Sequence, residues 1–259
     1  MKAYLERSRE SLSPDEKAWK RYVRVVENNS NEIGVQSDAW HRLAKNAVDQ
    51  DIDGYQMAQN VSWSEVTSHV TEGLSDAKPD IWEGYRASQY PRQAVDDLEW
   101  AIKPTSYDEA MPALCVEWKG PGGEMQVAER QCAYDGALMA DAAREVHEYL
   151  GKSPEVFYRH TQALTVALDG KYVLVHGHHI MPGEASGSLE YHQFSLNEFT
   201  PRRSLAEYRA LYKYIRNSQD WARERSTERL EELHALAKSR QTAPSAVKGL
   251  KSARTGASA

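Results

Sequence analysis

The middle of the chain carries an order of strand and helix patterns that restricts the fold more than any other part. Leu114 to Lys119 alternates between two kinds of side chain, as a strand with two different faces does. Gly120 to Gly123 ends this strand sharply, and a long helix is expected from about Met125 to Leu150. Two further strands are predicted to form a hairpin around Asp169 and Gly170, a pair preferred in tight turns. A strand, a long helix and a hairpin in this order predict a mixed α/β domain.

Helices are expected on both sides of this middle part. Capping signals predict helix starts at Ser13–Glu16, Ser37, Ser62–Glu65 and Ser204–Glu207. Pro79 marks a change to strands, with Asp80 to Tyr85 predicted as a short strand, and Leu189 to Leu196 is expected to form another. Two separate helices are predicted near the C-terminus, the second carrying Leu230, Leu233 and Leu236. The expected architecture is a central mixed sheet flanked by helices, with helical extensions at both ends.

The charge of the chain is unevenly distributed. It has 32 basic and 38 acidic residues, a formal net charge of -6, yet residues 238–259 hold five basic residues and no acidic one, so residues 1–237 carry -11. An acidic body argues against a general nucleic-acid coat protein, although clustered carboxylates can also be metal ligands. The basic tail is predicted to be disordered, with nonspecific DNA attachment or nuclear import as functional alternatives.

The composition and the apolar pattern of the chain exclude several classes of protein. The apolar runs fall far short of the roughly 20 residues that span a bilayer, and the first residues lack the apolar segment of a signal peptide. We therefore expect an intracellular protein, nuclear or cytoplasmic, without a membrane partner. Two cysteines, Cys115 and Cys132, are too few for a disulfide framework or a four-thiolate zinc site.

Three residues on two predicted strands have the chemistry of a hydrolytic metal site. Asp80 begins one strand, and Glu117 and Lys119 share a face of another. Two carboxylates can hold Mg²⁺ or Mn²⁺, and an ammonium beside them can orient a water molecule or stabilise charge on a phosphate. The pattern indicates phosphodiester hydrolysis.

These residues resemble the signature of the PD-(D/E)XK nuclease superfamily. The match reads Pro79-Asp80, then Glu117-x-Lys119, then Gln131 on the following helix. Residues 37–221 are also similar to a group of uncharacterised nuclease-like domains from filamentous fungi. The segments that recur there are Pro79-Asp80 with Gly84-Tyr85, the Glu117-x-Lys119 strand followed by glycines, and Ala128 with Gln131.

The resemblance implies a restriction-endonuclease-like core whose second and third strands carry the acids. It implies that Asp80 and Glu117 bind the metal, together with the backbone carbonyl of Trp118 and an acid on the first core helix, where Asp38 is preferred to Glu32. Lys119 would position water, and Gln131 would support the site. The implied domains are a helical extension over 1–36, the nuclease-like domain over 37–237 and the tail over 238–259, with DNA as the preferred substrate.

Other interpretations remain open. A nuclease fold without activity could serve as a binding or interaction module, and an RNase or structure-specific nuclease has the same signature. Because 36 residues separate Asp80 from Glu117, the two acids must converge in space for the enzyme interpretation to hold. His176 and His178 share a strand face, but a zinc site normally needs three or four ligands, so half-buried histidines are the simpler interpretation.

Overall fold

The computed structural model describes residues 1–28, 39–45, 54–120 and 123–242. The strands are β1 (Tyr55–Gln59), β2 (Ile81–Tyr85), β3 (Leu114–Trp118), β4 (Ala163–Leu168), β5 (Val173–Pro182) and β6 (Leu189–Phe199). The helices are α1 (Lys2–Leu5), α2 (Glu16–Asn28), α4 (Arg92–Leu98), α5 (Met125–Tyr149) and α6 (Leu205–Thr242), with short 3-10 turns between elements.

The six strands form one sheet in the order β1-β2-β3-β4-β5-β6. Neighbouring strands are antiparallel except β3 and β4, which are parallel. A parallel pair needs a long crossover, and α5 supplies it between the two strands. The mixed α/β fold class predicted from the sequence is therefore confirmed, and the acids lie at the second and third strands as expected.

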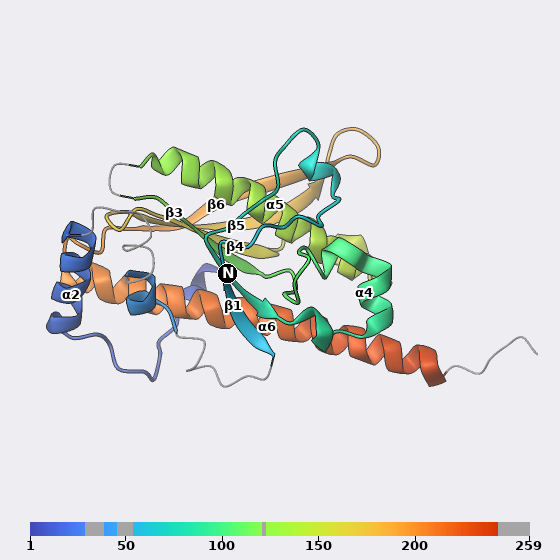
Figure 1. The fold of residues 1–259 in the computed structure, drawn as a ribbon, viewed down its shortest axis with the longest axis horizontal. Helices are drawn as coiled ribbons and strands as arrows, with labels where there is room; N and C mark the ends of the chain where they lie inside the picture. The colour runs from blue at the N-terminus through green and yellow to red at the C-terminus, as the bar shows by residue number, and fades with distance from the viewer. Residues whose placement is uncertain (29–38, 46–53, 121–122, 243–259) are drawn as a thin grey trace, which may run out of the picture.

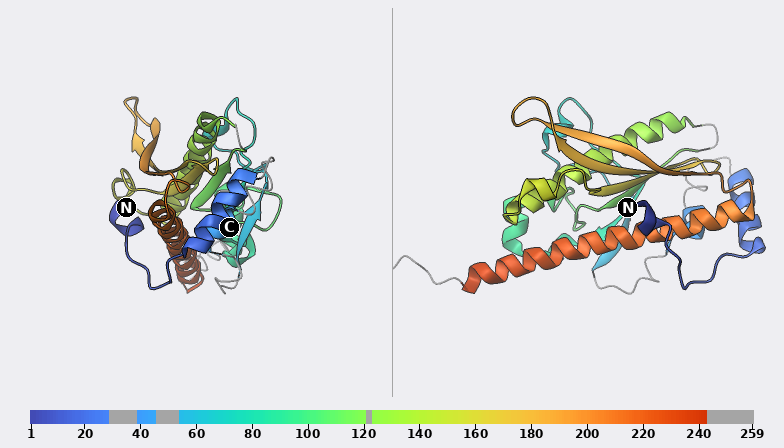
Figure 2. Two further views of the ribbon diagram at one scale, coloured as in Figure 1. Left: turned by 90° about the vertical axis from the view of Figure 1, so that its left-hand side faces the viewer. Right: turned by 180° about the vertical axis from the view of Figure 1, so that it is seen from behind.

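The sheet lies between two long helices, α5 on one face and α6 on the other (Figures 1 and 2). Leu114, Val116 and Trp118 pack in the apolar cluster on the α6 side, whereas Cys115 packs in the cluster on the α5 side. All five residues of β3 are buried, because helices cover both faces of this strand. The alternation of faces predicted for β3 is confirmed.

The N-terminal helices α1 and α2 and the C-terminal helix α6 pack against this core. Leu5 of α1 and Tyr22 of α2 are fully buried in the cluster shared with α6. The first turn of α2 is capped by Asp15, which accepts a hydrogen bond from the Ala18 amide at 2.7 Å. The predicted capping box at Ser13 is thus placed two residues too early. The cap at Ser204 is confirmed, since its hydroxyl accepts from the Glu207 amide at 3.1 Å.

Three predicted elements differ from the structure. The two C-terminal helices are one continuous helix, α6, because no glycine or proline interrupts residues 205–242. The helix expected from Ser62 is absent within the described segment 54–120, where Ser68 instead caps a 3-10 turn over His69–Thr71. The sheet also begins earlier than expected, with β1. The predicted helix start at Ser37 lies outside the described residues, although residues 39–43 are helical.

Within the parts of the chain that the structure describes, no helix is long and apolar enough to cross a membrane.

Candidate functional site

The pairing of β2 with β3 brings Asp80 and Glu117 to the same end of the sheet. Trp82 pairs with Cys115 and Ile81 with Val116, so the next position of this register sets Asp80 opposite Glu117. Residues two apart on a strand point to the same face. Asp80 is two residues from Trp82 and Glu117 is two residues from Cys115, and both Trp82 and Cys115 face α5, so the two acids face α5 as well. The long segment between the two strands therefore does not separate them. Asp80 also accepts a hydrogen bond from the Trp118 amide at 2.6 Å.

Lys119 follows directly after β3 and lies beside Glu117. Its Nζ atom is 4.0 Å from a carboxylate oxygen of Glu117, and its side chain is 18% exposed. Its amide donates to the Leu168 carbonyl at 2.8 Å, which extends the β3–β4 ladder by one residue. A Cβ atom on Gly123 would lie 2.8 Å from the Lys119 Cβ, so glycine is required for this close turn. Lys119 is therefore more accessible to solvent than Glu117, which is only 1% exposed.

Asp135 on α5 completes the cluster, and the sequence interpretation missed it. It is 2% exposed and is hydrogen-bonded to Glu117. The Cys115 thiol also donates to it at 3.7 Å. The signal was present in the sequence, because Asp135 is four residues after Gln131 and residues at this spacing share a helix face.

The buried carboxyl pair of Glu117 and Asp135 is electrostatically unfavourable. Burial, followed by the neighbouring Asp135 and Asp80, raises the pKa of Glu117, and Lys119 only partly offsets this. Burial also raises the pKa of Asp135, against the opposing effect of hydrogen bonds from Glu117 and Cys115. Two carboxyl groups this close do not both ionise readily, so the pair retains a proton at neutral pH.

The oxygen donors of the site suit a hard divalent cation. The Oε1 atom of Gln131 is buried and has no hydrogen-bond partner among the described residues, so an oxygen ligand is available one helical turn from Asp135. The carboxylates would have to exchange existing hydrogen bonds to bind a cation, because Asp80 is hydrogen-bonded to the Trp118 amide and Glu117 to Asp135. Among the described residues, no three His, Cys, Asp or Glu side chains stand in an arrangement that could hold a metal ion.

The histidines and cysteines near the site have packing roles. His178 is 2% exposed, and its Nε2 atom is hydrogen-bonded to Thr165 at 2.8 Å. Its ring lies so close to α5 that a side chain on Gly136 would collide with it. His176 is also buried, so both histidines are more enclosed than expected. Burial raises the pKa of the Cys115 and Cys132 thiols, which disfavours a thiolate nucleophile.

Three predicted site residues are placed with less detail. Asp38 and its alternative Glu32 lie outside the described residues. The Trp118 side chain faces the α6 side, as expected, and its backbone carbonyl stays a predicted ligand. On the same helix as Gln131, the Tyr134 hydroxyl donates to the Ser75 carbonyl at 3.0 Å.

Comparison with curated proteins gives no match, and comparison with solved structures gives none either. A family model described as a domain of unknown function, DUF7924, matches residues 19–234. This match extends from α2 to the second half of α6 and includes every strand of the sheet. The chain therefore belongs to the DUF7924 family.

Proposed function

We propose that this protein hydrolyses phosphodiester bonds with Mg²⁺ or Mn²⁺ as cofactor, acting as a nuclease with DNA as its preferred substrate. One observation carries the proposal. The β2–β3 pairing sets Asp80 opposite Glu117 at one end of the sheet, with the Lys119 ammonium 4.0 Å from the Glu117 carboxylate. This is the combination of two acids and a lysine that the sequence pattern required.

We assign metal binding to the buried acids and contact with water or phosphate to the more exposed lysine. Asp80 and Glu117 would hold the cation with support from Gln131, and Glu117 would exchange its hydrogen bond to Asp135 for that contact. When bound, the cation neutralises phosphate charge and lowers the pKa of a water molecule. Lys119, which is partly exposed, would orient the attacking water or stabilise charge on the phosphate.

A cleavage assay tests this function. Supercoiled plasmid, single-stranded DNA and RNA are each incubated with wild-type protein in Mg²⁺, in Mn²⁺ and in chelator. We expect metal-dependent cutting, strongest on DNA, and a loss of at least about 100-fold in Lys119→Ala because a positioned acid–base group typically contributes that much. The matched control is Lys171→Ala, which removes an exposed lysine on the β4–β5 turn and should leave cutting unchanged.

Cutting by Lys119→Ala at the wild-type rate would overturn the assignment, provided that both variants keep the wild-type melting temperature. The assay also separates DNA from RNA as the substrate.

A second function is supported by the way the acids are engaged. Glu117 is bonded to Asp135 and Asp80 to the Trp118 amide, and no three-ligand metal cluster is found in the described residues. This state suits a protein that keeps a nuclease-like fold as a binding or interaction module. If the wild type cuts none of the three substrates and titration calorimetry detects no Mg²⁺ or Mn²⁺ binding, this function replaces the first.

A further inference from the structure

A large pocket lies at the opposite end of the sheet from Glu117. Its volume is about 740 Å³, and its walls come from the C-terminal half of α5, the segment before β4 and the middle of α6. Along the axis of α5, Val146 in this pocket is about 16 Å from Asp135, at 1.5 Å per residue. The pocket is large enough for a small organic molecule and is separate from the carboxylate site.

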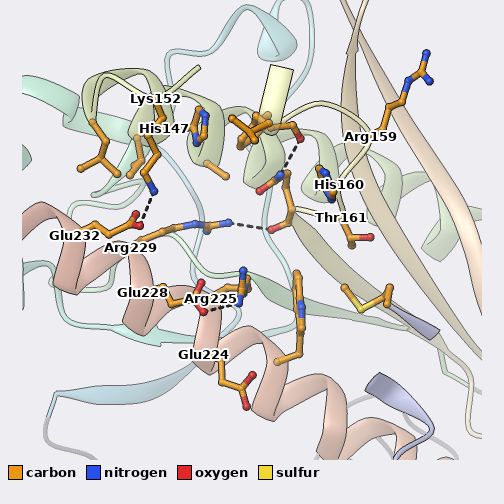
Figure 3. Close-up of a pocket in the computed structure, with 18 of the residues that line it drawn as sticks. His147, Lys152, Arg159, His160, Thr161, Glu224, Arg225, Glu228, Arg229 and Glu232 are labelled. Carbon is orange, nitrogen blue, oxygen red and sulfur yellow. Dashed lines mark hydrogen bonds and ion pairs between the residues drawn. The ribbon is translucent and has the colours of Figure 1, made fainter. Parts of the chain in front are cut away.

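Most charged side chains around this pocket already have partners. Lys152 pairs with Glu232, and Arg225 pairs with Glu228, as the dashed lines of Figure 3 mark. The third acid, Glu224, accepts a hydrogen bond from the Tyr4 hydroxyl. Each of the three acids of the lining therefore already has a partner other than Arg229.

The two exceptions are Arg159, which is exposed, and Arg229. The Arg229 side chain extends from α6 across the middle of the pocket, with Lys152 and His147 on one side and Arg225 on the other (Figure 3). It donates to the Gln162 carbonyl at 3.1 Å. Among the residues that the structure describes, no carboxylate lies within ion-pair distance of it. A guanidinium has five N–H donors, and the hydrogen bond to Gln162 uses only one of them.

The surroundings of Arg229 favour a bound anion. The pKa of Arg229 is lowered to about 10, mainly by burial and also by the nearby Arg225, against the opposing effects of Tyr90, Glu228 and Glu232. The Nε atom of Arg225 is itself buried and has no hydrogen-bond partner among the described residues. Arg225 and Arg229 lie one helical turn apart and repel each other, an effect that Glu228 and Glu232 oppose. A bound oxyanion would satisfy the donors and remove the repulsion.

The rest of the lining suits an apolar group next to that oxyanion. Val146 and Leu150 of α5, Phe157 before β4 and Trp221 of α6 contribute apolar or aromatic surface to the same pocket. We propose that this pocket binds a small organic anion, with a phosphomonoester or carboxylate on Arg229 and a flat apolar body against this surface. The proposal does not depend on the nuclease activity, because the two sites share no residue.

Titration calorimetry with four probes tests the proposal on the full-length protein. The probes are phenyl phosphate, phenylacetate, inorganic phosphate and benzyl alcohol. We expect at least one aromatic anion to bind at least tenfold more tightly than both inorganic phosphate and the neutral alcohol. Which of the two binds better identifies the oxyanion class. Arg229→Gln should weaken that binding at least tenfold, whereas Arg203→Gln, an equal charge change at an exposed site, should not.

A second measurement uses the wild-type protein alone. Phenylglyoxal modifies accessible arginines, and peptide mapping reports each site. The bound aromatic anion should slow modification of Arg229 severalfold and leave Arg203 unchanged. The proposal is overturned if neither aromatic anion binds at millimolar concentration, if benzyl alcohol binds as tightly, or if Arg229 is not protected.

Discussion

Two buried acids, Asp220 on the α6 face of the sheet and Glu117 on the α5 face, have opposite electrostatic surroundings. On the α6 face, Asp220 is surrounded by cations, with Arg9 at 2.6 Å, Arg223 at 3.2 Å and an ion pair to Lys45. Burial alone would raise the pKa of Asp220, but hydrogen bonds from Lys45 and Arg9 outweigh it, so the pKa is lowered. On the α5 face, Glu117 has an acid as its neighbour, and its pKa is raised.

Asp220 therefore stabilises the fold, whereas Glu117 and Asp135 lower its stability. Asp220 ties together α6, the segment around Arg9 and the residues around Lys45, which are far apart in the chain. Glu117 and Asp135 form no such tie, and one lysine at 4.0 Å does not neutralise both. Carboxyl groups held in unfavourable surroundings at a strand end are typical of functional sites.

The largest expected effect is on the α6 face. Asp220→Ala leaves Arg9 and Lys45 without their anion, and breaking such a buried group of charges should lower the free energy of unfolding by roughly 3 kcal/mol. Urea denaturation at pH 7 measures it. Asp96→Ala is the control, because it breaks the exposed pair with Arg92 and should cost less than about 1 kcal/mol. Equal losses in both variants would show that the Asp220 group is no more than a surface network.

The second largest expected effect is a pH dependence of stability that comes from His178, which lies on the α5 face. Burial lowers the pKa of His178 to about 3, whereas an unfolded histidine titrates near 6.5. Below pH 6.5 the unfolded chain therefore binds a proton that the folded chain does not, and stability falls as the pH falls towards 3. We expect a loss of about 2 kcal/mol from this group between pH 7.5 and pH 5.

Urea denaturation across that pH range measures the slope, and His178→Gln should make it shallower. The same slope in both proteins would contradict the low pKa of His178.

The local patterns of the sequence predict much of this fold. The period of two in β3, the length of α5 and the Asp169-Gly170 turn lead directly to the observed elements, because each depends on neighbouring residues. The continuity of α6 was missed because its polar middle, including Asn217 and Gln219, reads as a break in the apolar stripe. These polar residues are instead buried in contacts with distant segments.

The candidate site likewise has residues that the sequence motif predicts and one that only the packing of the fold shows. Asp80, Glu117 and Lys119 follow from a motif, and their convergence requires only the pairing of β2 with β3. Asp135 could not be singled out by its helix spacing alone, since many residues share that face of α5. Its meaning comes from the packing of α5 on β3, which buries it against Glu117 and Cys115. The Arg229 pocket depends likewise on three segments that meet only in the folded chain.

The smallest expected effect has the opposite sign and tests the comparison most directly. Asp135→Asn keeps the shape of the side chain and can still bond to Glu117, but it removes the second acid of the buried pair. Because the folded-state pKa of both acids is raised, the wild type loses stability as the pH rises above the unfolded values near 4. The variant should therefore gain about 1 kcal/mol at pH 8 and less at pH 5.

Asp135→Asn should also cut DNA more slowly, because it changes the polarity around Glu117 even though it stabilises the fold. Urea denaturation at the two pH values and the plasmid assay measure the two quantities, with Glu117→Gln as the reciprocal change. A loss of stability in both variants would show that the acid pair supports the fold as Asp220 does, and the contrast between the two faces would fail. A gain in stability together with slower cutting would identify the pair as a functional feature that the fold tolerates.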